Sequence, residues 1–326
     1  MNEYNSFTEC YIDLAKQIYQ EPDFVCAPRG MKVKEKLGVR FKIKNPLDRL
    51  PYVPARKFSV TYVIAELLWY LSGEDKTEWI SNYSSFWNKI SDDGETANSA
   101  YGARIFKFHE RIAGSELVQW DYVKEELQRD PDSRRAVIHI RSPWDSTKAK
   151  LDVPCTLTLQ FFIRNDELHM VVNMRSSDLI LGIAYDIPAF TIFQELLARE
   201  LNVGVGEYIH VSNSLHIYER HFKMVEEMLL PENIRLSEMH HYDAGAMPEI
   251  PSDPPISKLY EIEGHIRAAL DVNTVNYLVE ATTYLGDYWH DWVKVLAAHR
   301  CKKLKSGEAY KALLNETHFR GFRIFE

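Results

Sequence analysis

Three strand-like runs follow one another between residues 135 and 175, and they constrain the fold more than any other part of the chain. The runs 153–164 and 167–175 are separated only by Asn165-Asp166, a turn typical of an antiparallel hairpin. Long helical patterns surround these strands irregularly instead of alternating with them. The sequence has no GxGxxG or GxxxxGK[ST] motif. The pattern therefore predicts an α+β fold with a mixed β-sheet and long helices, and no dinucleotide or P-loop site.

Apolar periodicity places further elements along the chain. We expect helices over residues 1–20, 58–72, 117–129, 188–201, 215–229 and 258–315. We expect an exposed strand pair over 24–44 with a turn at Arg29-Gly30, a strand at 135–141 and another at 207–213. Gly73 and Asp130-Pro131 are the stop signals of the second and third helices.

Composition changes in the last third of the chain, where a proline-rich stretch precedes a helical region rich in Tyr, Trp, Ala and Lys. We therefore predict a catalytic domain over residues 1–235, a proline-rich linker over 236–257 and a helical extension over 258–326. The apolar faces of the extension predict packing on the catalytic domain or an oligomer contact. Nothing in the extension indicates chemistry of its own.

Charge and hydropathy exclude several classes of function. The net charge is −8 and the sequence pI about 5.9, which argues against a partner that is a nucleic-acid polymer and favours a small molecule. No run approaches the roughly 18 apolar residues of a membrane span, and the start does not read as a signal peptide. The four cysteines are scattered without CxxC spacing, which predicts a reducing, cytoplasmic location with neither disulfides nor a zinc site.

Cys155 is the candidate nucleophile. A cysteine on an apolar strand is most often a small buried hydrophobe. Here Pro154 directly precedes it, and proline belongs at an edge or at the first residue of a strand, so we expect Cys155 at an accessible strand end. A thiolate needs cationic neighbours to lower its pKa. Arginines stand in two nearby strings, at 131–135 and 173–178.

Five motifs now make a resemblance specific. They are PDSRR at 131–135, VPC at 153–155, MRSSD at 174–178, LGIAYD at 181–186 and SLHIYERH at 214–221. In order and spacing they resemble the thymidylate synthase family, with the match running from about residue 10 to 225. The resemblance implies a thymidylate synthase-like fold, a homodimer with shared active sites and no metal. It also implies a pyrimidine nucleoside monophosphate substrate and 5,10-methylenetetrahydrofolate as the co-substrate that donates the carbon.

The same resemblance implies how the nucleotide is held. Cys155 would add to C6 of the pyrimidine, which activates C5 for attack on the donated carbon. We expect Arg29, Arg175 and Ser176 to bind the phosphate, with Arg134 and Arg135 reaching it from a second subunit. Asp178 and Gly182 would lie along the nucleotide. His216 and Tyr218 would bind the sugar hydroxyl.

Further residues match positions that act around the ring. Glu66 matches the family glutamate that organises proton transfer through ordered water. Tyr101 and Trp87 match positions that line the site, with Trp87 on the folate side. In the simpler interpretation, Arg134 and Arg135 are solvent-exposed residues at the start of a strand. It makes His216 and Tyr218 ordinary core and surface residues of a helix. Glu66 resists such a reading, because buried carboxylates are rare unless paired or functional.

Asp186 stands where methylating thymidylate synthases have asparagine. An asparagine amide has a donor and an acceptor for the O4 and N3–H of uracil, whereas a carboxylate only accepts and would repel O4. Cytosine presents an amino donor at C4 and an acceptor at N3, so a carboxyl that shares one proton with N3 pairs with both. Asp186 therefore predicts cytosine selectivity. The alternative is that Asp186, before Ile187-Pro188, only caps a helix.

Two other departures point the same way. Thr156 follows the nucleophile where methylating enzymes commonly have histidine, and Ser214 takes the place of an aspartate that contacts the folate ring. These features are similar to the (deoxy)cytidylate 5-hydroxymethyltransferases, in which water and not hydride completes the product. Glu66 is our candidate for activating that water. The alternatives are a thymidylate synthase that methylates dUMP and a non-catalytic nucleotide-binding relative. The sequence leaves open ribose against deoxyribose and the biological pathway.

Overall fold

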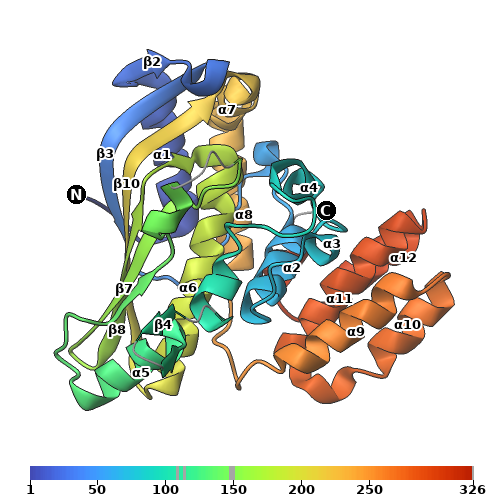
Figure 1. Cartoon of the computed structure of the whole chain (residues 1–326). Coiled ribbons are helices and arrows are strands. Elements are labelled where there is room, and N and C mark those ends of the chain that lie inside the picture. Colours follow the sequence, from blue (N-terminus) through green and yellow to red (C-terminus); the bar gives the residue numbers. More distant parts are fainter. Residues whose placement is uncertain (108–109, 113–114, 147–150, 325–326) are drawn as a thin grey trace.

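A mixed sheet of eight strands forms the centre of the protein (Figure 1). The computed structural model describes residues 1–107, 110–112, 115–146 and 151–324. The strand order is β1 (Asn2–Tyr4), β3 (Val33–Ile43), β10 (Gly204–Tyr218), β8 (Glu167–Met174), β7 (Thr156–Arg164) and β6 (Val137–His139), with β2 (Phe24–Cys26) paired to β3 and β9 (Ser177–Asp178) paired to β10. A separate antiparallel pair is formed by β4 (Glu110–Ile112) and β5 (Ser115–Leu117). Because β8 and β10 are parallel while β7 and β8 are antiparallel, the predicted α+β class is confirmed.

The β7–β8 hairpin brings the two chemically important strand ends together. Asn165 and Asp166 both have positive φ, 53° and 60°, the conformation that a tight hairpin turn requires and that Asn and Asp tolerate. The pairing runs from Arg164 opposite Glu167 to the other end of the hairpin, where the Arg175 N–H donates to the Cys155 carbonyl at 2.9 Å. The predicted hairpin is therefore confirmed, and its register sets Cys155 beside Arg175.

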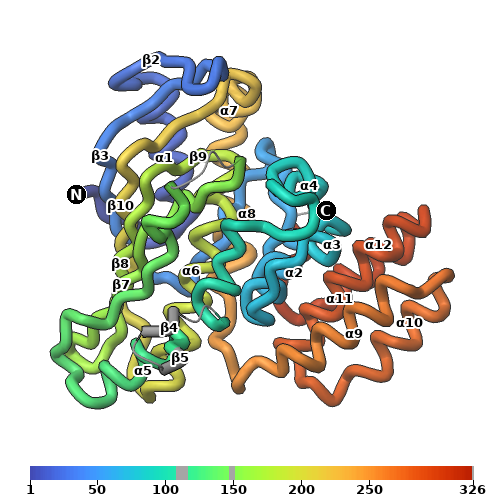
Figure 2. Tube along the Cα trace, viewed as in Figure 1, coloured from blue at the N-terminus to red at the C-terminus, as the bar shows by residue number. Residues whose placement is uncertain are grey.

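One face of the sheet is covered by helices. The helices α1 (Phe7–Gln20) and α6 (Ala184–Glu200) lie against it, and α2 (Val60–Leu71) packs on α6 (Figures 1 and 2). The strand β8 alternates between buried and half-buried side chains, as a strand with one covered face must. Its even-numbered residues point into the core, whereas Val171 and Asn173 lie on the other face. In the described part of the chain, the β8 side chains on this other face are only half-buried.

The remaining helices surround this unit. They are α3 (Thr77–Ile80), α4 (Phe86–Ile90), α5 (Gln119–Arg129), α7 (Phe222–Met228), α8 (Pro231–Ala244), α9 (Ile256–Ala268), α10 (Val272–Glu280), α11 (Gly286–Lys303) and α12 (Gly307–Asn315). The last four form the extension, and α11 packs against α2 (Figure 1). The Tyr260 ring stacks on Trp79 with centroids 5.0 Å apart, and Tyr83 donates to the buried Glu263 at 2.7 Å. The extension thus supports the helices that carry the site.

Three sequence expectations need correction. Residues 215–218 continue β10 and are not helical, because they pair with β3 and β9; the helix begins only at Phe222. Helix α8 extends to Ala244, so the extended proline-rich stretch is shorter than the linker expected at 236–257. Helix α6 begins at Ala184, four residues before Pro188. Pro188 therefore lies inside the helix, one turn beyond its start, and leaves the Ala184 carbonyl without its usual intrahelical donor.

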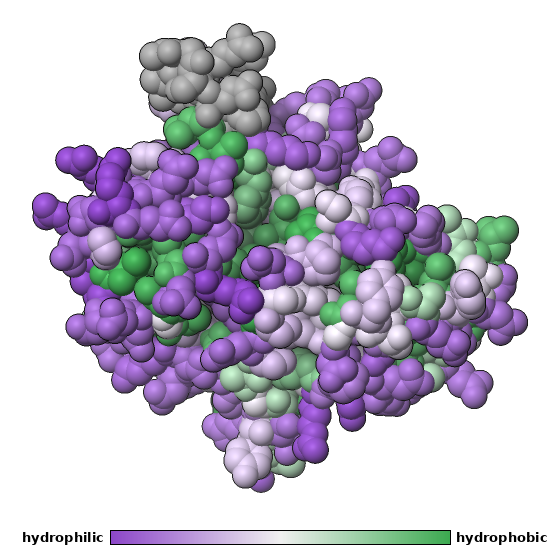
Figure 3. Space-filling model, turned by 90° about the horizontal axis from the view of Figure 1, so that it is seen from below, coloured by the Kyte–Doolittle hydropathy of each residue, from purple (hydrophilic) through white to green (hydrophobic). Residues whose placement is uncertain are grey.

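One stretch of the described residues, Leu179–Glu200, is long and apolar enough to cross a membrane. Most of it (78% of its most apolar window) is buried inside the protein, as in the central helix of a packed core. On the face drawn in Figure 3, hydrophilic side chains interrupt and border the apolar surface.

Candidate active site

The nucleophile candidate Cys155 lies against one guanidinium group. Arg175 donates from Nε to the Pro154 carbonyl at 2.9 Å and from Nη2 to the Val153 carbonyl at 2.8 Å. The same Nη2 lies 3.5 Å from Cys155 Sγ. Burial raises the pKa of the thiol, while the positive charge of Arg175, and more weakly that of Arg29, lowers it. Arg175 therefore both holds the turn before the thiol and favours its ionised form.

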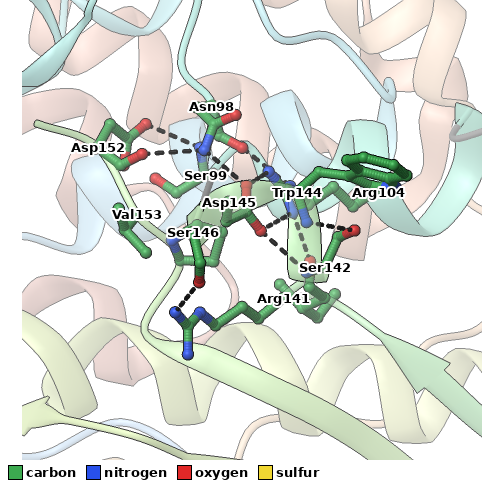
Figure 4. Close-up of polar contacts among 12 residues, drawn as sticks. Asn98, Ser99, Arg104, Arg141, Ser142, Trp144, Asp145, Ser146, Asp152 and Val153 are labelled. Carbon is green, nitrogen blue, oxygen red and sulfur yellow. Dashed lines mark hydrogen bonds and ion pairs between the residues drawn. The ribbon is translucent and has the colours of Figure 1, made fainter. Parts of the chain in front are cut away.

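A polar network fixes Asp152, which stands three residues before Cys155 in the chain (Figure 4). Asp152 accepts from the Ser99 N–H at 2.8 Å, and Asn98 donates to the Asp152 carbonyl at 2.9 Å and to Asp145 at 3.0 Å. Arg104 donates two hydrogen bonds, each 2.8 Å long, to the carboxylate of Asp145. These bonds tie the segment that leads to Tyr101 to the segment that leads to Cys155. Sequence reasoning missed this network, although Asp152 directly before VPC was a signal for it.

Glu66 is buried on α2 among aromatic side chains. Its Oε1 accepts from the Tyr62 hydroxyl at 2.6 Å, and the Trp87 Nε1–H donates to the Tyr62 oxygen at 3.0 Å. Burial raises the pKa of Glu66 to about 8, although hydrogen bonds from Tyr62 and Tyr70 oppose that rise. The rings of Tyr70 and Tyr101 stack with centroids 5.5 Å apart. The structure thus brings Glu66, Trp87 and Tyr101 into one aromatic wall, and it adds Tyr62 and Tyr70, which sequence reasoning had not singled out.

Asp186 lies in the first turn of α6, facing this wall. The residue at the N-cap position is Ile183, and Asp178 is the residue whose side chain caps the preceding turn, accepting from the Ile180 N–H at 2.8 Å. The interpretation of Asp186 as a helix cap is therefore wrong. Burial, with the negative charge of Asp178 in support, raises the pKa of Asp186 to about 7. A Cβ at Gly182 would lie 3.4 Å from Asp186 Oδ2, so glycine leaves space beside this carboxyl.

The turn before Asp186 is held by a residue that sequence reasoning also missed. The buried Arg56 donates to the Ile180 carbonyl, to the Tyr185 hydroxyl at 3.3 Å and to the Tyr11 hydroxyl at 3.1 Å. It also lies over the Tyr185 ring, 4.8 Å from the centroid. Arg56 is therefore a structural cation that fixes the backbone leading into α6.

The expected sugar-binding residues lie on β10. The rings of His216 and Tyr218 meet edge to face with centroids 5.0 Å apart, and His216 pairs in register with Asp178. Burial lowers the pKa of His216, which favours the neutral imidazole. Arg29 stands at the β2–β3 turn with φ 54°, and its charge acts on both Cys155 and His216. These residues border the same region as the thiol.

Other expected residues lie elsewhere or make other contacts. Arg134 and Arg135 are exposed before β6, where Val137 pairs with Gln160. Along β7 this places Arg135 roughly 20 Å from Cys155 at about 3.3 Å per residue. Ser214 Oγ donates to Glu35, on β3. Ser176, directly after Arg175, is half-buried. Among the described residues, no group of three or more His, Cys, Asp or Glu is arranged to hold a metal ion.

Comparison with known proteins identifies the family. The profile of the family described as "Thymidylate synthase" matches residues 9–250, which includes every strand of the sheet except β1, nearly all of the covering helices and the site. The chain belongs to the thymidylate synthase family. Among curated proteins, it is similar to a deoxyuridylate hydroxymethyltransferase of Bacillus phage SP01, with 34% identity over 222 residues. That alignment covers 65% of this chain and 57% of the phage protein, so the chain spans little more than half the length of this thymidylate synthase relative.

Proposed function

We propose that the protein is a folate-dependent C5-hydroxymethyltransferase whose substrate is a cytidine monophosphate, CMP or dCMP. The observation that carries the proposal is the half-buried carboxyl of Asp186, which lies close enough to Cys155 and Glu66 for its charge to act on both and takes no part in capping its helix. Membership of the thymidylate synthase family supports one-carbon transfer to a pyrimidine nucleotide.

The base is chosen by hydrogen-bond chemistry at Asp186. An ionised carboxylate offers only acceptors, so it pairs with the amino group of cytosine and repels O4 of uracil. A proton shared between Asp186 and N3 completes the pairing and draws electrons from C6, where a thiolate adds. The negative charge of Asp178 supports retention of a proton on Asp186, because the two carboxylates repel one another.

Cys155 and Glu66 supply the covalent and proton-transfer chemistry. Cys155, stabilised as a thiolate by Arg175, adds to C6 and leaves C5 nucleophilic. Glu66, with a pKa raised to about 8, is able to gain and lose a proton near neutral pH. It thereby deprotonates the water that completes the hydroxymethyl group. Arg175 and Arg29 also provide positive charge for the phosphate.

In this proposal the flat ring of methylenetetrahydrofolate stacks against the wall beside Glu66. Phe86 and Leu181, next to Trp87 and Gly182, are large apolar side chains with 49% and 51% of their surface exposed. Exposed apolar side chains at the edge of a site favour stacking of an aromatic ligand. The co-substrate supplies the one-carbon unit, while Trp87 and Phe86 orient it toward C5.

The active unit in this proposal is a homodimer. The outer face of the sheet carries half-buried apolar side chains, among them Val171, Ile209 and Val211, which a second copy would cover. Arg134 and Arg135 lie far from Cys155 of their own chain, so in the dimer they serve the phosphate of the partner's site. This arrangement makes each site depend on both chains.

Uridylate is the second candidate substrate for the same reaction. The phage relative is named for deoxyuridylate, and a pKa of about 7 leaves Asp186 partly protonated at neutral pH. A neutral carboxyl has one donor and one acceptor, as an asparagine amide does, and pairs with O4 and N3–H of uracil. This candidate predicts that activity on dUMP falls as pH rises above 7.

Product mass tests the proposal. The protein is incubated separately with CMP, dCMP and dUMP plus methylenetetrahydrofolate, and the nucleotides are weighed. We expect a gain of CH₂O on a cytidine nucleotide and release of tetrahydrofolate. A gain of CH₂ on dUMP alone, with dihydrofolate, would identify a methylating thymidylate synthase. Unchanged masses for all three nucleotides, with properties that Cys155→Ala leaves intact, would identify a non-catalytic binding protein.

A further inference from the structure

Three residues on one stripe of α2 surround the carboxyl that is proposed to transfer protons. Tyr62, Glu66 and Tyr70 are spaced four residues apart, so their side chains lie on the same side of the helix. The Tyr62 hydroxyl donates to Glu66 Oε1 at 2.6 Å, and the Tyr70 hydroxyl weakly lowers the pKa of the same carboxyl. Among the described contacts, the hydrogen bond to the Glu66 carboxyl therefore comes from Tyr62.

The Trp87 indole determines the direction of the Tyr62 bond. An indole N–H donates and has no acceptor lone pair, so the Tyr62 oxygen must accept in the 3.0 Å contact from Trp87 Nε1. A phenol carries one proton, and the only acceptor in the described contacts of Tyr62 is Glu66 Oε1. Tyr62 therefore donates to Oε1 as long as Trp87 is in place.

This fixed direction decides which oxygen of Glu66 handles the proton. An oxygen that accepts a strong hydrogen bond has carbonyl or carboxylate character, so a proton on the carboxyl resides on Oε2. The groups facing Glu66 are Tyr62 and Tyr70 on α2 and the carboxyl of Asp186 on α6; Tyr101 stacks behind Tyr70. All are neutral or acidic, so the Tyr62 hydrogen bond is the main contact that favours ionisation of Glu66.

We propose that Tyr62 is a positioning residue that couples Trp87 to the proton-transfer carboxyl Glu66, so that the state of the folate-side wall sets the ionisation of the carboxyl. The coupling rests on the proposed function for its purpose, but its geometry does not depend on which nucleotide binds. The edge-to-face contact of Tyr62 with Tyr185, centroids 4.9 Å apart, holds the ring for this role.

The test measures the protonation of the Glu66 carboxyl directly, in the protein without ligands. Difference infrared spectroscopy follows the protonated carboxyl band as pH is changed, and Glu66→Gln assigns the band. In Tyr62→Phe, which keeps the ring but removes the donor, we expect the midpoint of Glu66 to move up by about one pH unit, because one bond to the charged form is lost. Trp87→Phe should move it in the same direction by less, and not at all in the Tyr62→Phe background.

A matched control separates a specific bond from a general effect. Tyr83→Phe removes the same kind of bond, from a tyrosine to the buried Glu263, outside the site. It should leave the Glu66 midpoint unchanged. An unchanged midpoint in Tyr62→Phe, or in Trp87→Phe should Tyr62→Phe fail to fold, would overturn the inference. So would a Trp87→Phe shift that persists at full size without the Tyr62 hydroxyl.

Turnover provides the second reading. In Tyr62→Phe, kcat should fall about 10-fold at its optimum, and the limb of the pH profile that reports Glu66 should move to higher pH. A merely structural role of Tyr62 would lower kcat equally at every pH. If the midpoint moves in the infrared titration while no nucleotide gains mass, the coupling stands and the proposed function fails.

Discussion

The Arg175 Nη2 lies 3.5 Å from the Cys155 sulfur while the same guanidinium binds the carbonyls of Val153 and Pro154. Arg175, whose positive charge favours the thiolate, therefore also holds the backbone turn that precedes Cys155. Burial raises the pKa of the thiol, and the negative charges of Asp186 and Asp152 raise it further, so its reactivity depends on this cation and, to a lesser degree, on Arg29.

Arg175→Gln should raise the pKa of Cys155 and slow its alkylation by iodoacetamide at neutral pH by about 10-fold, because the main opposing positive charge is lost. Arg29→Gln should slow it less. The pH dependence of the alkylation rate, with Cys155→Ala as the blank, gives the pKa of the Cys155 thiol in each variant. Equal rates in Arg175→Gln and the wild type would contradict the assigned role of this guanidinium.

Asp186→Asn should move base preference from cytidylate toward uridylate by about 100-fold in the ratio of the two kcat/KM values. The amide regains the donor that uracil O4 requires and loses the shared proton that cytosine uses. Glu66→Gln serves as the control, since it should lower kcat for both nucleotides alike. A preference that is the same in Asp186→Asn and the wild type would remove Asp186 from base recognition.

The pH dependence of stability follows from the same carboxyl. The native pKa of Asp186 is raised from 3.8 to about 7, so between these values the native state binds more protons than the unfolded state. The free energy of unfolding therefore falls as pH rises through this window, by up to about 4 kcal/mol from this group. Urea unfolding at several pH values should show a shallower fall in Asp186→Asn. An unchanged slope would contradict the raised pKa.

Shared active sites make a mixing experiment decisive. Cys155→Ala and the double variant Arg134→Ala/Arg135→Ala should each be nearly inactive as homodimers. When the two are mixed and allowed to exchange subunits, about a quarter of wild-type activity should return, because half of the dimers are mixed and each has one intact site. No recovery after demonstrated exchange would show that these arginines do not act across the interface.

The sequence predicted the β7–β8 hairpin, α2 and α5 well because their signals are local; the first helix begins only at Phe7, since residues 2–4 form β1 against β3. Asn165-Asp166 marks the turn, and helical periodicity ends at Gly73 and Asp130. Residues 215–218 were assigned to the wrong element, since their strand character depends on pairing with β3 on one side and β9 on the other. Such tertiary pairing overrides local pattern.

For the candidate site, the family resemblance suggested Cys155, Arg175, Glu66 and Asp186, but not the residues that hold them. Arg56 and Arg104 act through contacts with carbonyls and side chains distant in sequence, which no spacing reveals. The Tyr62–Glu66–Tyr70 stripe was visible as helical spacing. Its meaning depends on Trp87, which reaches Tyr62 from a separate helix.

A covalent trap tests the central claim most directly. Fluorine at C5 of the pyrimidine prevents release from the enzyme, because the step that removes the C5 hydrogen as a proton is blocked. We expect 5-fluorocytidine monophosphate, in its ribo or deoxy form, to form an adduct with methylenetetrahydrofolate present. Peptide mass mapping should place the adduct on Cys155, and Cys155→Ala should lack it. An adduct with the 5-fluorouridine nucleotides alone, or on no cysteine, would contradict the account.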